Sequence, residues 1–187
     1  MTEPTRTTAP AQYLTREQVH ALIDAANPGR DRLFIRVAWE TGARVSELVA
    51  LRCVDVLTLE GDGREFVYLG GPKAARAVYV SGSLMGDLCE FIRGDHWLPQ
   101  NLIFGFTRYT AFRMVRDTAR RAGLVLEGGR DITPDALRAA FTMNLILQDV
   151  PLSVVQELVG QASLKGVSAH AKTDPARVRE YLRKVEF

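Results

Sequence analysis

Cysteine and lysine are scarce in this sequence of 187 residues. Its two cysteines, Cys53 and Cys89, provide neither a disulfide framework nor the spacing of a metal site. No apolar run approaches the roughly 20 residues that a membrane-spanning helix needs. The polar N-terminus, MTEPTRTTAPAQ, lacks the apolar core of a signal peptide. We therefore expect a soluble, cytoplasmic protein with no metal and no membrane partner.

The sequence has only a small excess of positive charge, but its basic residues are mostly of one kind. The net charge is +2, so total charge does not indicate a nucleic-acid-binding protein. Among 24 lysines and arginines, the only lysines are Lys73, Lys165, Lys172 and Lys184. Arginine carries a planar fork of donors that fits phosphate oxygens. A GC-rich genome, whose codons favour arginine, explains the same bias, so both interpretations stay open.

The chain divides into a short tail and one domain. Residues 1–12 are rich in Thr, Pro and Ala and are expected to form a flexible tail. Residues 13–187 are long enough for a single domain, and a hydrophobic content of 47% supports a sizeable core.

Periodic apolar residues between recognisable caps predict helices along most of this domain. Thr15 and Gln18 match a capping box, and Thr133 followed by proline is a typical helix start. Gly42 and Gly160 are typical C-terminal stops. The expected helices span residues 16–26, 30–42, 45–51, 83–93, 107–122, 134–148, 151–160 and 175–186.

Residues 54–80 change to the period of β-strands. VDVLTLE, REFVYLG and RAVYV predict three short strands, joined by turns at GDG and GPKAA. The predicted fold class is therefore mainly α with a small antiparallel three-stranded sheet (α+β).

The expected helix over residues 107–122 has two adjacent faces of different character. Apolar residues at helical spacing occupy one face and arginines the neighbouring face: Phe112, Val115, Ala119 and Ala122, then Arg113, Arg116 and Arg120. This pattern predicts a helix packed on one side with a cationic stripe suited to DNA. A merely solvated surface face explains the stripe as well.

Three segments carry a family resemblance. TGARVSELVALRCVDV (41–56), TPDALRAAF (133–141) and LVGQASLKGVSAH (158–170) occur in this order. They resemble the T-G-x-R-x-S-E-L-x-x-L, H-x-x-R and L-G-H-x-S-x(6)-Y signatures of the tyrosine recombinase (phage integrase) family. The resemblance covers about residues 13–187 and implies the fold of that family's catalytic domain. We expect no separate N-terminal DNA-clamping domain in this sequence.

The resemblance implies a chemistry. The family cuts DNA by attack of a tyrosine on a phosphodiester, and it needs neither a metal nor another cofactor. Arg44 and Arg138 match its two catalytic arginines, which stabilise charge on the phosphate oxygens. An alternative is that they are structural and pair with Glu47 or Asp135. Gly71 stands where the family's catalytic lysine is usual, with Lys73 two residues away in the same turn.

Other family positions have changed. Asp135 replaces a histidine and lies three residues before Arg138, so the two can pair on a helix. Alternatively, Asp135 has a structural role as an acidic residue in the first helical turn, where it favours the helix dipole. Gln161 replaces a histidine or tryptophan, but its amide still donates to a phosphate oxygen. His170 stands at the position of the nucleophilic tyrosine. The later Tyr181 is expected to pack within the last helix.

These departures predict a catalytically inactive, tyrosine-recombinase-like protein that binds double-stranded DNA. It would act as a regulator or accessory factor on a mobile element or plasmid, without a small-molecule substrate. The expected phosphate-binding residues are Arg44, Lys73, Arg113, Arg116, Arg120, Arg138 and Gln161. A strand transferase that uses His170 as its nucleophile, and a protein-interaction module on the same fold, remain alternatives. The resemblance also implies self-association through the C-terminal helix at 175–186.

Overall fold

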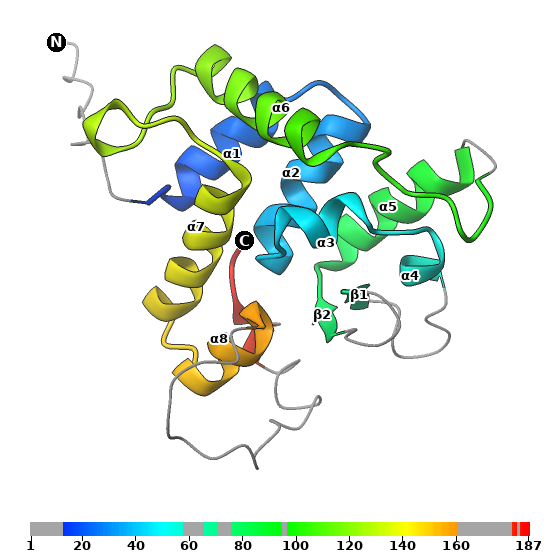
Figure 1. Ribbon diagram of the computed structural model, residues 1–187. Coiled ribbons are helices and arrows are strands. Elements are labelled where there is room, and N and C mark those ends of the chain that lie inside the picture. The colour runs from blue at the N-terminus through cyan, green and yellow to red at the C-terminus, as the bar shows by residue number, and fades with distance from the viewer. Residues whose placement is uncertain (1–12, 58–65, 71–75, 95–96, 161–180, 183) are drawn as a thin grey trace, which may run out of the picture.

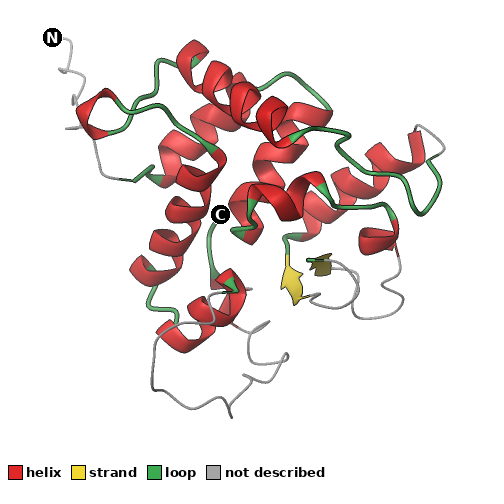
Figure 2. Cartoon of the chain, viewed as in Figure 1, coloured by secondary structure: helices red, strands yellow, loops and turns green. Residues whose placement is uncertain are grey.

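A computed structural model describes residues 13–57, 66–70, 76–94, 97–160, 181–182 and 184–187. Helices dominate these residues, and a small antiparallel hairpin lies beside them (Figures 1 and 2). The elements are α1 (Arg16–Ala25), α2 (Arg30–Thr41), α3 (Val45–Val49), α4 (Val54–Leu57), β1 (Phe66–Leu69), β2 (Arg76–Tyr79), α5 (Gly82–Gly94), α6 (Arg108–Arg121), the 3-10 turn η2 (Glu127–Gly129), α7 (Pro134–Leu147) and α8 (Leu152–Val159). In the described part of the chain, no helix has the length and apolar character needed to cross a membrane.

Helix α2 is the centre of the core. It packs against α7, α1 and α5 and also contacts α3 and β2 (Figure 1). Its sequence is apolar on most sides, and Phe34, Ile35 and Trp39 are almost completely buried. Apart from Arg36, all residues from Leu33 to Thr41 are buried, whereas the charged residues of the first turn lie nearer the surface. Residues at its ends are therefore held in fixed positions.

The helix boundaries follow the caps that the sequence indicates. Thr15 and Gln18 form a capping box at the start of α1. Gly42 and Gly160 adopt the left-handed conformation directly after α2 and α8. Thr133 is the N-cap of α7. The predictions of these four termini are confirmed.

The expected three-stranded sheet needs a correction. Strands β1 and β2 form an antiparallel pair, as predicted, in the register Phe66↔Tyr79. Residues 54–57 of the remaining expected strand form the short helix α4, and residues 58–60 lie outside the described residues. The Asp55 carboxylate accepts a hydrogen bond from the backbone N–H of Arg52 at 2.9 Å, which favours a helical turn. Strand-like pairing occurs just upstream instead, at an isolated antiparallel bridge between Arg52 and Leu102. Alternating apolar residues in VDVL therefore misled the strand prediction.

The last described residues pack against the rest of the chain. Leu182 and Val185 are buried in the core, and Tyr181 lies partly buried against it. The Phe187 ring stacks on Phe141 at 6.3 Å between centroids. These contacts confirm the packing role expected of Tyr181, whereas most of the helix expected over 175–186 lies outside the described residues.

Glu40 is a buried carboxyl group in α2. Only 4% of the residue is exposed, and its carboxylate accepts a hydrogen bond from the Ser81 backbone N–H at 2.8 Å. The Arg36 guanidinium lies 3.6 Å away. Burial raises the pKa of Glu40, and these partners offset the effect only in part. The folded state consequently holds this proton more tightly than the unfolded chain does.

Glu40→Gln should therefore gain stability relative to the natural protein as the pH rises. Above the ordinary pKa of 4.5 the unfolded chain releases this proton first. The contribution of Glu40 to folding stability then falls with increasing pH, whereas glutamine does not titrate and still accepts the Ser81 hydrogen bond. Urea unfolding of both proteins near pH 4.5 and near pH 7 measures the difference. If the free energies of unfolding of the two proteins differ by the same amount at both pH values, the pKa of Glu40 is not raised in the folded state.

Candidate phosphate-binding site

The turn between α2 and α3 places Arg44. Gly42 ends α2 with a φ of 56°, and its N–H donates to the Ala38 carbonyl at 3.1 Å. The Thr41 hydroxyl donates to the Val37 carbonyl at 2.5 Å and accepts from the Ala43 N–H at 3.2 Å. Arg44 is the N-cap of α3, so its side chain leaves the backbone at a rigid junction between two helices.

Arg138 reaches the same junction from α7. Its Nη1 donates to the Gly42 carbonyl at 2.5 Å, and its Nη2 donates to the Val159 carbonyl at 2.5 Å. One guanidinium therefore connects the end of α2 with the end of α8. This connection fixes the orientation of the fork.

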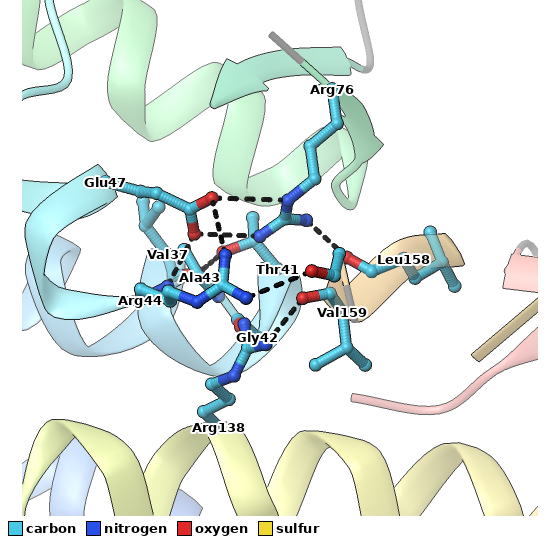
Figure 3. A network of polar contacts seen from close by, with 11 residues as sticks. Val37, Thr41, Gly42, Ala43, Arg44, Glu47, Arg76, Arg138, Leu158 and Val159 are labelled. Carbon is cyan, nitrogen blue, oxygen red and sulfur yellow. Dashed lines mark hydrogen bonds and ion pairs between the residues drawn. The ribbon is translucent and has the colours of Figure 1, made fainter. Parts of the chain in front are cut away.

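The C-terminal end of α8 gathers three guanidinium groups. Arg44 donates from Nη2 to the Gly160 carbonyl at 3.0 Å, and Arg76, the first residue of β2, donates from Nη1 to the Leu158 carbonyl. Figure 3 shows Arg138 and Arg76 converging from opposite sides on this place. Carbonyl groups at a helix C-terminus carry partial negative charge and stabilise cations. We call Arg44, Arg76, Arg138 and Glu47 the arginine cluster.

Glu47 is the carboxylate of the arginine cluster. It accepts hydrogen bonds from the Arg44 backbone N–H at 2.6 Å and from Arg76 Nη2 at 2.9 Å. Its distance to the Arg44 guanidinium is longer, 3.8 Å. Burial raises the pKa of Glu47, but hydrogen bonds from Arg76 and the Arg44 backbone, with the positive charge of both arginines, bring it below its ordinary value. The carboxylate is therefore ionised.

The cluster has a surplus of positive charge. Burial, together with the nearby Arg44 and Arg76, lowers the pKa of Arg138 to about 10. The guanidinium stays protonated at neutral pH. The arginine cluster therefore holds three guanidinium groups and one carboxylate, of which Arg44 and Arg76 contact the carboxylate (Figure 3). Such an arrangement favours a bound anion with several acceptor oxygens, such as a phosphodiester.

The structure brings together some of the predicted site residues. Arg44 and Arg138 lie side by side as expected, while Lys73, Gln161 and His170 lie outside the described residues. Asp135 is exposed on α7. Across the described ranges no ion pair within 4.0 Å joins Asp135 to Arg138, whose guanidinium donates to backbone carbonyls. The negative charge of Asp135 still acts on Arg138 from a longer distance and opposes the lowering of its pKa.

The cationic stripe on α6 is separate from the arginine cluster in its contacts. Arg113 lies over the Tyr109 ring at 5.8 Å, and Arg116 pairs with Asp117 at 3.3 Å. Arg120 donates both Nε and Nη2 to Asp131, at 3.2 and 3.0 Å. Two of the three charges are thus partly compensated within the chain. Arg113, which is exposed, is the best placed to meet an external phosphate.

Arg76 was not among the sequence-based candidates. Its partners are Glu47 and Leu158, which lie 29 and 82 residues away in the sequence. Local periodicity contains no information about such contacts. The available signal was an arginine at the start of a strand whose inward neighbours are apolar.

A family model and similar curated proteins all point to one family. The model of the phage integrase family matches residues 12–177. Tyrosine recombinase XerC of Mycobacterium sp. strain KMS is 31% identical over 193 residues, which cover 93% of this chain and 62% of the relative. The chain spans about three fifths of the length of the curated relatives that it matches.

Solved structures show the same fold. The integrase from mycobacterium phage Brujita superposes with a TM-score of 0.71 at 18% identity, over 100% of this chain and 62% of that one. XerH site-specific recombinase bound to palindromic difH substrate superposes with a TM-score of 0.68 at 22% identity, over 96% of this chain and 54% of that one. At these identities the likeness establishes the architecture alone.

Proposed function

This chain belongs to the phage integrase family, and on that basis we propose that it is a double-stranded DNA-binding protein that does not cut DNA. The DNA phosphate would bind at the arginine cluster. The protein would act as a regulator or accessory factor on a mobile element or plasmid. The XerH relative, whose structure contains its DNA substrate, supports a DNA partner.

The convergence of Arg44 and Arg138 carries the proposal. Both guanidinium groups are held by carbonyls at the end of α8, so their orientation does not depend on DNA. A guanidinium has five N–H donors, and within the described residues the Arg44 side chain donates one hydrogen bond and that of Arg138 donates two. A phosphodiester would bind to donors that these bonds do not use. The Arg44 side chain is 49% exposed, so a phosphate can reach it.

The absence of cleavage follows from the residue at the nucleophile position. His170 stands where the family has its tyrosine. An imidazole is shorter than a phenol, and Gly71 and Asp135 stand at two further positions where the family has a lysine and a histidine. Substitution of several catalytic groups at once fits a domain that keeps phosphate binding after losing the chemistry.

Binding to genomic fragments from the source organism tests the proposal. The purified protein should retain fragments at low salt and release them progressively as salt increases, because phosphate contacts release counterions. Sequencing of the retained DNA supplies the site. No binding at low salt would refute the DNA function and favour a protein-interaction module.

Self-association through residues 175–186 is part of the proposal. This part rests on the family resemblance alone, because Leu182 and Val185 pack in this chain's own core and would have to leave it to enter a second copy. Sedimentation of the full chain with and without duplex DNA should detect a dimer or larger species. A monomer at all concentrations and on DNA would contradict this part.

A further inference from the structure

Glu47 has two competing cationic partners in the arginine cluster. It lies 2.9 Å from Arg76 Nη2 and 3.4 Å from Arg76 Nε, but 3.8 Å from Arg44 Nη1. The Arg76 contact is therefore a hydrogen-bonded ion pair, whereas the Arg44 side-chain contact is a longer electrostatic one. The two arginines also differ in exposure: the Arg76 side chain is 17% exposed and that of Arg44 is 49% exposed.

We infer that Arg76 is a positioning residue for the phosphate site, because it holds the Glu47 carboxylate and so leaves the Arg44 guanidinium available to a DNA phosphate. The inference rests on the proposed function, since it assigns a role within the same site. The ligand is a phosphodiester oxygen, bound by Arg44 and Arg138. Arg76 acts through Glu47 and does not contact the DNA.

Charge and geometry support this division of roles. Three of the five N–H donors of Arg76 are used inside the chain: two on Glu47 and one on the Leu158 carbonyl. Without Arg76, the cation that lies nearest to the half-buried carboxylate among the described residues is Arg44, whose backbone N–H already donates to it at 2.6 Å. Arg44 would then turn toward Glu47. The site would lose the positive charge of Arg76. The charge of Arg44 would also be largely neutralised by its ion pair with Glu47.

The position of Arg76 also gives the hairpin a part in the site. Arg76 begins β2, whereas Glu47 lies in α3 and Leu158 lies in α8. A single side chain thus connects three elements that are distant in sequence. Gly160 leaves room for this connection, because a Cβ at that position would lie 3.1 Å from Arg76 Nε. The availability of Arg44 therefore depends on where the hairpin holds Arg76.

A double-mutant cycle tests the inference. Arg76→Met removes the charge at similar length, and Glu47→Gln removes the carboxylate while its amide oxygen still accepts the Arg44 backbone bond. Arg76→Met should weaken binding of a duplex by about tenfold, as is typical of coupled neighbours. Adding Glu47→Gln should restore the affinity to within about threefold of the natural protein. A double variant that binds no better than Arg76→Met would overturn the inference, since direct DNA contact or a purely structural role predicts no rescue.

Two further variants control for charge and folding. Arg76→Lys keeps a counter-ion for Glu47 and should bind within about threefold of the natural protein. Arg93→Met removes an equal charge from the last turn of α5, which contributes nothing to the cluster, and should change affinity little. Thermal melting of every variant identifies any that does not fold. If Arg76→Met does not fold, Arg76→Gln replaces it in the cycle. Arg76→Gln should bind DNA weakly, and adding Glu47→Gln should restore the affinity.

Inorganic phosphate separates this inference from the proposed function. Chemical shifts of the arginine side-chain N–H groups report phosphate binding to the same set of variants without DNA. If Glu47→Gln restores phosphate binding to Arg76→Met but the protein binds no DNA, the role of Arg76 is supported and the DNA function is refuted. DNA binding without rescue on either ligand would refute the role of Arg76 alone.

Discussion

Arg44→Ala/Arg138→Ala should weaken binding to duplex DNA by at least about 100-fold at moderate salt. Each guanidinium loses charge-assisted hydrogen bonds to a phosphate, which contribute roughly 1.5–3 kcal/mol apiece. The slope of log affinity against log salt should also fall in magnitude by roughly 1, because both arginines bind one phosphate and about 0.9 counterions are released for each phosphate that is neutralised. Fluorescence anisotropy with one labelled duplex over a range of salt measures both quantities.

A variant of equal charge change provides the control. Arg16 and Arg93 are exposed on α1 and α5, outside the arginine cluster. Arg16→Ala/Arg93→Ala should keep most of the affinity. Because Arg138 also connects α2 with α8, melting curves must show that the cluster variant is folded. If it is not, Arg44→Ala alone tests the phosphate site, since within the described residues that side chain donates one hydrogen bond, to the Gly160 carbonyl. Equal losses in the two double variants would mean that the cluster has no special role.

Gly42→Ala should destabilise the fold by roughly 2–5 kcal/mol. The residue has a φ of 56°, where an L-amino acid costs about 1–2 kcal/mol. A Cβ at this position would also lie 2.2 Å from Phe141 Cδ1, and forcing extra volume into a packed core costs roughly 1–3 kcal/mol. Phe141 is itself fully buried and has no room to retreat. Urea unfolding of the variant measures the loss.

Gly105→Ala is a matched control for this prediction. Its φ of 57° is almost the same as that of Gly42, but nothing lies within 4 Å of a Cβ built there. The control should lose only the backbone part, about 1–2 kcal/mol. The difference between the two variants therefore isolates the contact with Phe141. Equal destabilisation by both would show that Phe141 moves freely and that the α2–α7 contact is loose.

Helix boundaries could be predicted because each depends on a few neighbouring residues. The capping box at Thr15 and the left-handed glycines after α2 and α8 determine the backbone within one turn. Arg44 and Arg138 could be predicted as partners only because two separate segments resemble one family. Their meeting depends on the packing of α2 against α7.

Other features depend on contacts that local patterns do not contain. Residues 54–57 alternate like a strand, yet the Asp55 hydrogen bond to Arg52 makes them helical. The backbone carbonyls of Val159 and Gly160 accept hydrogen bonds from Arg138 and Arg44. A backbone carbonyl is present at every residue, so the sequence does not indicate which ones bind these arginines. Arg76 was missed for a related reason, because its role comes from a carboxylate on a different element.

Native and denaturing electrophoresis of one saturated complex most directly tests whether the protein binds DNA without cutting it. The sample would contain the duplex recovered from genomic fragments, with a nick beside the site to trap any covalent product. We predict a complete mobility shift on the native gel, and on the denaturing gel protein-free strands of the same lengths as in the DNA without protein. A strand that remains attached to protein after denaturation, and is absent with His170→Ala, would contradict the account and identify an active strand transferase.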